Sequence, residues 1–197
     1  MKPFFSLLFF CLALSVACAQ NRKAEACFKK SCYNLAEAFA RKDMAAVNKY
    51  VDTATGVYVI ARPGAIDYAK RQKKLDAGES FAVYPYKDSL KVRQCILHYA
   101  TAPQYNCSEE KWNKEGFYAD TASGQNHRLS EVIDFSIKFN AGEHTQKELD
   151  EIKKLERISR KITFTNLGPN GLVFYLYYHN KKWRLLLVDT TAGDCSA

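Results

Sequence analysis

Two tyrosines and an arginine near the C-terminus are the residues whose types and spacing come closest to a chemical site. Tyr175, Tyr177 and Arg184 lie on either side of a two-residue turn in an apolar segment. Pairing around that turn sets Tyr177 opposite Arg184, on the face that Tyr175 shares. An arginine that binds an anionic group, beside tyrosines that stack and donate hydroxyls, would form a ligand site. The sequence therefore predicts ligand binding at these three residues. The alternative is that Tyr177 and Arg184 only stack on a solvated or helix-covered face.

The segment that carries these residues, 161–189, is typical of three antiparallel strands. Turn residues at 168–171 separate the first two strands, and Asn180-Lys181 separates the last two. A two-residue turn fixes which residues of the last two strands face each other. We expect one face to belong to the core, through three pairs: Leu176 with Leu185, Phe174 with Leu187, and Tyr178 with Trp183.

Motifs for catalysis and for metal binding are not found in the sequence. It contains no phosphate-binding glycine loop and no motif of a known hydrolase. Cys95, His98 and Cys107 suggest half of a metal site, but strand residues three apart point to opposite faces. We therefore expect no metal and no cofactor.

The N-terminus has the features of a targeting segment. Lys2 precedes an apolar run over residues 4–16, and Ala17-Cys18-Ala19 forms a small-residue cleavage site. Cleavage after Ala19 would deliver the chain to the periplasm or the extracellular space. Residues 14–18 also resemble a bacterial lipoprotein box, so a lipid anchor at Cys18 is the alternative. The apolar run is too short for a membrane-spanning helix, and no later run is longer.

Length and charge limit the classes of partner. Removing the first 19 of 197 residues leaves enough chain for a single domain, residues 20–197, with its own apolar core. The net charge is +8, but the basic residues are interleaved with acidic ones. An exported protein seldom meets nucleic acid, and no recognition motif is present. We expect an envelope or extracellular partner and no nucleic acid.

Five cysteines follow the predicted cleavage site, and export permits disulfides. Cys27 and Cys32 lie five residues apart on one predicted helix, on different faces, which does not suit a disulfide. Cys107 lies in a polar loop, and Cys195 lies in the tail after the last strand. The favoured disulfide is Cys107–Cys195, with five free thiols as the alternative.

Hydrophobic periodicity predicts helices at both ends of the first 160 residues. An apolar stripe beginning at Phe28 indicates a helix over residues 22–41, and Asp43 suits the N-cap of a short second helix. A helical pair is predicted later in the chain. Its first helix begins near Leu129 with Ser130 as a plausible cap, and its second begins with a capping box at Thr145.

Strands are predicted between and after these helices. We expect them at residues 57–60, 81–84 and 90–99, with a charged segment at 65–77 that is a candidate for a short helix and a long polar loop at 102–125. Helices, strands, a helical pair and a closing three-strand meander favour the α+β class over an alternating parallel sheet. The expected architecture is a curved antiparallel sheet closed by that meander.

Two resemblances follow from particular motifs. GVYVIARPGA at 56–65, the loop with Tyr105, Cys107 and Lys111-Trp112, and the ending from 172 to 197 resemble uncharacterised exported proteins of Bacteroidetes-type bacteria. The closing hairpin, a long strand turning into Lys182-Trp183-Arg184, is similar to the end of nuclear-transport-factor-2-like and cystatin-like domains. The second resemblance implies a curved sheet wrapped around a helix. Neither resemblance implies an activity.

Two classes of function are consistent with these observations. The first is a non-catalytic exported binding module whose ligand is an envelope polysaccharide, a peptide or a protein. The dispersed aromatic residues of the 102–125 loop and the missing catalytic motif favour it. The second is a small pocket enzyme of the nuclear-transport-factor-2-like type. Its site would combine Tyr175, Tyr177 and Arg184 with an acid, Asp52 or Asp120.

Overall fold

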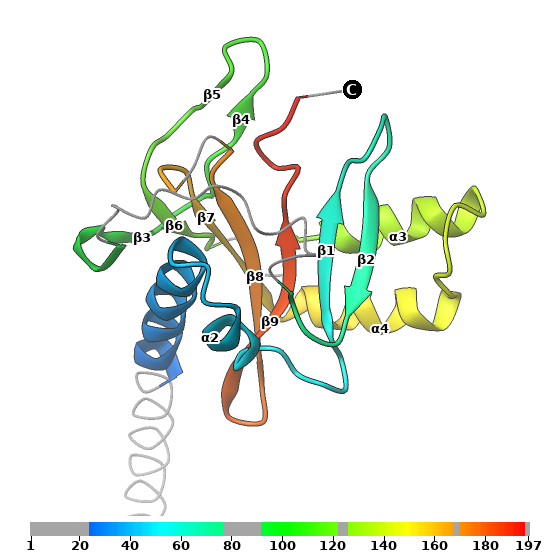
Figure 1. Cartoon of the computed structure of the whole chain (residues 1–197), viewed down its shortest axis with the longest axis horizontal. Coiled ribbons are helices and arrows are strands. Elements are labelled where there is room, and N and C mark those ends of the chain that lie inside the picture. The colour runs from blue at the N-terminus through cyan, green and yellow to red at the C-terminus, as the bar shows by residue number, and fades with distance from the viewer. Residues whose placement is uncertain (1–23, 77–91, 122–125, 168–169, 196–197) are drawn as a thin grey trace, which may run out of the picture.

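A seven-stranded sheet with the strand order β2-β1-β9-β8-β7-β6-β3 is the centre of the fold (Figure 1). The computed structural model describes residues 24–76, 92–121, 126–167 and 170–195. A separate small sheet pairs β4 (Tyr105–Asn106) with β5 (Lys111–Trp112). The strands of the main sheet are β1 (Val57–Ala61), β2 (Tyr68–Gln72), β3 (Leu97–Tyr99), β6 (Phe117–Ala119), β7 (Ser159–Phe164), β8 (Leu172–His179) and β9 (Lys182–Asp189).

In the described residues, the helices lie close to the ranges that the sequence predicts. The N-terminal helix covers residues 24–40, followed by α2 (Met44–Asn48). The later pair is α3 (Arg128–Lys138) and α4 (Gln146–Arg157). Two of the three predicted side-chain caps are confirmed, since Asp43 accepts from Ala46 N at 2.9 Å and Thr145 accepts from Glu148 N at 3.2 Å.

Each face of the sheet carries its own apolar core. The N-terminal helix and α2 pack on one face, through residues such as Phe28, Leu35 and Phe39. The helices α3 and α4 pack on the opposite face, through Leu129, Ile133 and Leu149 among others. Figure 1 shows the two helical layers on either side of the strands. The sheet therefore has no open face where these helices lie.

The α+β class and the helical pair are confirmed, and the sheet differs in one respect. The meander β7-β8-β9 lies in the middle of the sheet and is antiparallel. However, β1 pairs with β9 in parallel, and β3 pairs with β6 in parallel. The sheet is therefore mixed rather than wholly antiparallel. Long connections run between the parallel strands, as that geometry requires.

The β8–β9 turn has the predicted two-residue loop. Asn180 and Lys181 have φ angles of 48° and 60°, as a tight hairpin turn of this type requires. The predicted pairs nearest the turn are confirmed, and they include Tyr177 opposite Arg184. Tyr178 also faces Trp183 as predicted, but its side chain is 40% exposed, because it lies near the end of the hairpin.

A β-bulge changes the register farther from the turn. The shift lies between Tyr175 and Leu176, so Phe174 faces Val188 and not Leu187. Leu187 faces Tyr175 and packs with α3 and α4. The prediction that Leu187 shares a core face with Phe174 is therefore wrong, because one additional residue of β9 reverses the direction of the side chains that follow.

Three other segments differ from the predictions. Residues 68–72 form the edge strand β2, although the charged segment 65–77 suggested a helix. The 102–125 loop contains β4, β5 and β6. The N-cap of α3 is His127 and not Ser130. The buried Glu156 accepts instead from the backbone N–H groups of the first turn.

Two predictions concern other parts of the chain. Within 90–99, only Leu97–Tyr99 is a strand, after a 3-10 turn at Val92–Gln94. The predicted strand at 81–84 lies outside the described residues. So do the predicted targeting segment and Cys18.

Candidate functional site

A groove runs between α3 and the turn that joins β1 to β2. Its two adjoining hollows, of about 300 and about 410 Å³, share Ala65, Ile66 and Asp67 of that turn. One hollow is completed by residues of the first two turns of α3, and the other by Tyr68 and by residues farther along. Concave, mostly apolar surfaces of this size are where proteins commonly bind ligands. We refer to these two hollows together as the α3 groove.

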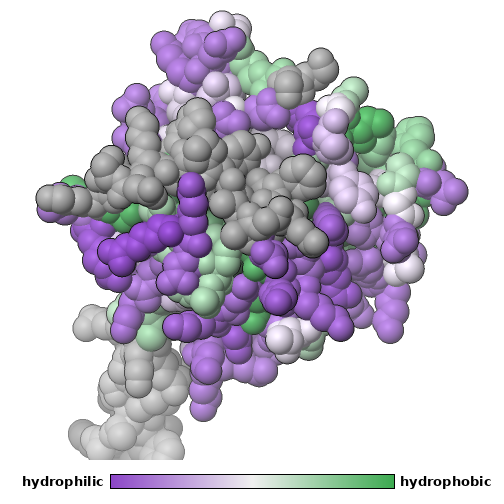
Figure 2. All heavy atoms as spheres, in the orientation of Figure 1, coloured by the Kyte–Doolittle hydropathy of each residue, from purple (hydrophilic) through white to green (hydrophobic). Residues whose placement is uncertain are grey.

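Large apolar side chains are exposed along the α3 groove. Ile66 is 54% exposed, Phe135 is 37% exposed and Tyr68 is 40% exposed. Phe139, next to Phe135 with ring centroids 4.4 Å apart, is 66% exposed. These four are half of the eight large apolar side chains that are exposed in the described part of the chain. Figure 2 shows hydrophobic side chains gathered at the upper right, over α3 and the β1–β2 turn. A patch of this kind marks an interaction surface.

A network of charged side chains closes the inner end of the α3 groove. The Arg128 guanidinium donates to Asp67 at 2.6 Å, to Asp189 at 3.1 Å and to the Thr191 hydroxyl at 2.7 Å. Arg62 adds a second ion pair to Asp67, at 2.7 Å. Two arginines thus meet two aspartates, and the network as a whole is neutral. It fixes the turn to the start of α3.

The pKa of Asp67 reflects this pairing. Burial of the carboxyl acts to raise its pKa, but the hydrogen bonds and charges of Arg62 and Arg128 outweigh burial. The pKa of Asp67 therefore lies below its usual value. The aspartate stays ionised and committed to the two arginines.

Glu131 is the remaining charged residue of the groove. It lies in the first turn of α3 and is exposed. Its carboxylate has no hydrogen bond or ion pair with any described residue. Since the arginines nearby are already paired, Glu131 gives the groove one unpaired negative charge. The α3 groove can therefore accept an apolar group that is accompanied by a positive charge.

The structure buries the two predicted tyrosines and pairs Tyr177 with Arg184 across the β8–β9 hairpin. Tyr175 and Tyr177 are 2% and 1% exposed, and burial raises the pKa of both hydroxyls. The charges that act on Tyr175 include Asp189 and Asp120, whereas Asp52 and Arg184 act on Tyr177. Arg184 is half-buried, and its Nε has no partner.

Ligand binding at these three residues stays a prediction. Neither hollow of the α3 groove is lined by any of them. The face that carries the two tyrosines is covered because α3 and α4 pack on it.

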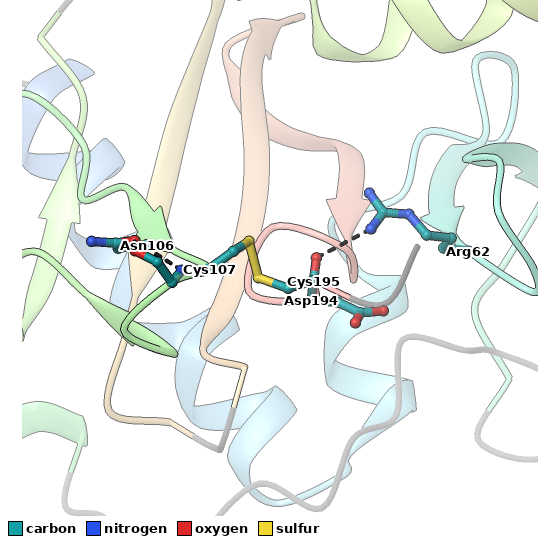
Figure 3. Close-up of a disulfide and its surroundings, with 6 residues drawn as sticks. Arg62, Asn106, Cys107, Asp194 and Cys195 are labelled. Atoms are coloured by element: carbon teal, nitrogen blue, oxygen red, sulfur yellow. Dashed lines mark hydrogen bonds between the residues drawn. A yellow bond between two sulfur atoms is a disulfide. The ribbon is translucent and has the colours of Figure 1, made fainter.

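The predicted disulfide is confirmed. Cys107 and Cys195 are bonded across a sequence separation of 88, with their Cα atoms 5.6 Å apart (Figure 3). Cys27, Cys32 and Cys95 are free. Next to the bond, Arg62 donates to the Asp194 carbonyl at 3.2 Å, as Figure 3 shows. The disulfide therefore ties the C-terminal tail to the connection between β4 and β5, and Arg62 links the same tail to the turn that builds the α3 groove.

Sequence reasoning missed the α3 groove because its two walls come from distant segments. Ile66 and Asp67 lie about sixty positions before Arg128 and Phe135. One signal was present in the sequence: Phe135 and Phe139 lie beside the apolar stripe of α3 rather than within it. Two large aromatic residues just outside the buried stripe of an amphipathic helix indicate a second, exposed apolar surface.

Two further kinds of feature are not found in the ranges described. No group of three or more His, Cys, Asp and Glu side chains there is arranged to hold a metal ion. None of the helices described is both long and apolar enough to span a membrane. Comparison of the chain with protein-family models, with curated proteins and with solved structures finds no match.

Proposed function

We propose that this protein is an exported, non-catalytic binding protein whose α3 groove holds a segment of a partner polypeptide. The observation that carries the proposal is the exposure of Ile66, Phe135 and Tyr68 along two adjoining hollows. Burying such side chains against a partner contributes about 25 cal/mol for each Å² of apolar area removed from water. Aromatic residues of this kind are typical anchors of protein interfaces.

The charges of the groove favour one kind of segment. Glu131 is unpaired, while Arg128 and Arg62 are committed to Asp67 and Asp189. A segment with a bulky apolar residue next to a lysine or arginine satisfies both the apolar wall and Glu131. A polysaccharide suits this groove less well, because its hydroxyls would lose water against Ile66 and Phe135 without gaining partners.

Export is part of the proposal and is supported by two observations. The chain begins with a basic residue, an apolar run and a small-residue cleavage site. The Cys107–Cys195 disulfide is of the kind that persists in oxidising compartments. The resemblance to exported proteins of Bacteroidetes-type bacteria agrees with both observations.

The test is selection of peptides from a random display library on the mature protein. We expect enrichment of peptides in which a bulky apolar residue adjoins Lys or Arg. Ile66→Asp and Phe135→Asp should each weaken binding of the selected peptides at least about tenfold, the loss expected for an interface anchor. Glu131→Gln should weaken it about threefold and only for peptides that carry the basic residue.

Ile96→Asp is the matched control. Ile96 is 71% exposed and lies next to β3, at the opposite edge of the sheet. Equal losses for Ile96→Asp and Phe135→Asp would show that binding does not use the α3 groove. Enrichment of no peptide, or of acidic peptides, would overturn the proposed ligand.

A further inference from the structure

Lys161 has an unusual position on the sheet face that α3 and α4 cover. It lies in β7 between Ile162 and Arg160, and Ile162 packs in the opposite core with the N-terminal helix. Side chains alternate along a strand, so Lys161 points toward α3 and α4. Its ammonium group has no hydrogen bond or ion pair with any described residue. Burial lowers the pKa of Lys161, although Asp189 and Asp120 partly counteract this effect.

Neither Asp189 nor Asp120 gives the Lys161 ammonium group a hydrogen-bond partner. The Asp189 carboxylate already accepts from Arg128, from the Thr191 backbone N–H at 3.0 Å and from the Thr191 hydroxyl at 2.8 Å. Asp120 meets Lys161 through the main chain, where its N–H donates to the Lys161 carbonyl at 2.9 Å. A cation taken out of water without a hydrogen-bonded partner is costly, which makes Lys161 a candidate binding group.

Thr163 continues the same row of side chains. It is two residues after Lys161 in β7, so the two side chains leave the same face about 7 Å apart. Thr163 is 0% exposed, and its hydroxyl has no hydrogen-bond partner. Buried hydroxyls are nearly always bonded, so one without a protein partner needs an explanation.

Trp112 supplies a third donor without a partner. It lies in β5 and packs against the α3/α4 core, and its buried Nε1 has no hydrogen-bond partner. The indole lies close over the β7–β8 connection, since a Cβ at Gly171 would come within 3.2 Å of Trp112 Cζ2 and of the Thr165 Cα. Thr165 follows the end of β7 directly and lies two residues after Thr163. Trp112 thus adjoins the end of the row that Thr163 and Lys161 form.

We propose that Lys161, Thr163 and Trp112 form a binding site for a small carboxylate. All three present N–H or O–H donors without acceptors, and they carry one unpaired positive charge. A carboxylate matches them, because it brings one negative charge and two oxygens that accept several hydrogen bonds. Lys161 and Trp112 are half-buried, so the row reaches the surface at these two residues, while the Thr163 hydroxyl and Trp112 Nε1 lie beneath it. This site is separate from the α3 groove and does not depend on the proposed function.

The two tryptophans of the chain provide the experiment. Trp183 serves as an internal control, since its Nε1 donates to the Ala24 carbonyl at 3.3 Å on the opposite face. We would record indole N–H resonances of the ¹⁵N-labelled mature protein, assign them with Trp112→Phe, and titrate with benzoate and with pyruvate. The Trp112 resonance should shift saturably with at least one of the two carboxylates, while that of Trp183 stays in place.

Variants then test whether the row itself binds. Lys161→Met keeps the length of the side chain and should weaken binding about tenfold or more, the loss expected for a charged hydrogen bond. Thr163→Val should weaken it about threefold to tenfold. Lys153→Met, a change to an exposed lysine of α4, should leave binding unchanged.

Several outcomes would overturn the site. They are the absence of a Trp112 shift at tens of millimolar of either carboxylate, equal shifts of both indoles, and a shift that survives Lys161→Met. A shift caused by phenyl phosphate and not by carboxylates would overturn the ligand class. The titration of the wild-type protein decides the first two outcomes even if a variant fails to fold.

Discussion

The two faces of the central sheet carry different kinds of side chain. On the face of the N-terminal helix, aromatic rings pack closely, with centroids 4.6 Å apart for Phe28 and Trp183 and for Phe117 and Phe164. The Arg160 guanidinium lies over this face, 4.6 Å from the centroid of the Phe28 ring, and also forms an ion pair with Glu25. On the α3/α4 face lie both buried charged side chains of the described residues, Glu156 and Asp189.

This difference separates stability from binding. The apolar face stabilises the fold chiefly through buried area. On the α3/α4 face, ion pairs and donors without partners take the place of part of the apolar buried area. Their net contribution to stability is small. Both proposed binding regions belong to the α3/α4 side. The four predictions below test the contrast, beginning with the largest effect.

Phe174→Ala should produce the largest loss of stability. Phe174 is 0% exposed in the core beneath the N-terminal helix, with its ring centroid 6.2 Å from that of Phe39. A cavity of this size lowers the free energy of unfolding by about 3–5 kcal/mol. Urea denaturation measures the change. A loss below about 1 kcal/mol would contradict the view that this face is the stabilising one.

Replacing both disulfide cysteines, with Cys107→Ser and Cys195→Ser, should have the next largest effect. The bond closes a long loop, and its removal frees the tail and the hairpin that carries Trp112. We expect the free energy of unfolding to fall by about 2–4 kcal/mol, as is usual for native disulfides. Denaturation with and without reductant measures it. The control is Cys27→Ser, which alters an exposed free thiol and should change little.

Asp67→Asn should have a moderate effect that depends on pH. The substitution leaves Arg62 and Arg128 without their shared carboxylate and should lower stability at pH 7 by about 1–3 kcal/mol. Because the pKa of Asp67 is depressed by folding, its stabilisation is present above the unfolded value and is lost as pH falls through the folded one.

Denaturation between pH 7 and pH 3 tests that sign. The difference in unfolding free energy between the wild-type protein and Asp67→Asn should shrink as the pH falls. A difference that stays constant over this range would show that the carboxylate does not act through its charge.

Phe135→Ala should have the smallest effect on stability. The side chain is 37% exposed at the α3 groove, so its truncation should change the unfolding free energy by no more than about 0.5 kcal/mol. The same variant should lose most of its affinity for peptides selected on the wild-type protein. A large loss of stability would mean that the groove belongs to the core, and the contrast between the two faces would fail.

Local signals in the sequence were sufficient for much of the fold. The caps at Asp43 and Thr145, the stripe of the first helix and the Asn180-Lys181 turn each depend on neighbouring residues, so a short window contains them. The Cys107–Cys195 disulfide was favoured because one cysteine lies in a polar loop and the other in the tail, although the sequence left five free thiols as an alternative.

The features that escaped prediction depend on distant parts of the chain. β2 is an edge strand whose consecutive Lys70 and Arg71 are both exposed, so it lacks the alternating pattern of a half-buried strand, and such charged residues protect a sheet edge from pairing. The row of Trp112, Lys161 and Thr163 exists only because Trp112 of β5 lies close to the connection between β7 and β8. No short window contains both walls of the α3 groove.

The β-bulge at Tyr175 and Leu176 has a consequence for how this sequence can change over time. In the unbulged register, Asp189 would share the direction of Leu185 and point into the apolar core beneath the N-terminal helix. The extra residue of β9 reverses the alternation of the side chains that follow it, and Asp189 therefore points toward Arg128. Deletion of Leu186, the residue that the bulge leaves unpaired, would give a regular ladder in which Leu187 and Asp189 keep their present directions, so Asp189, the last residue of the strand, should keep its ion pair with Arg128.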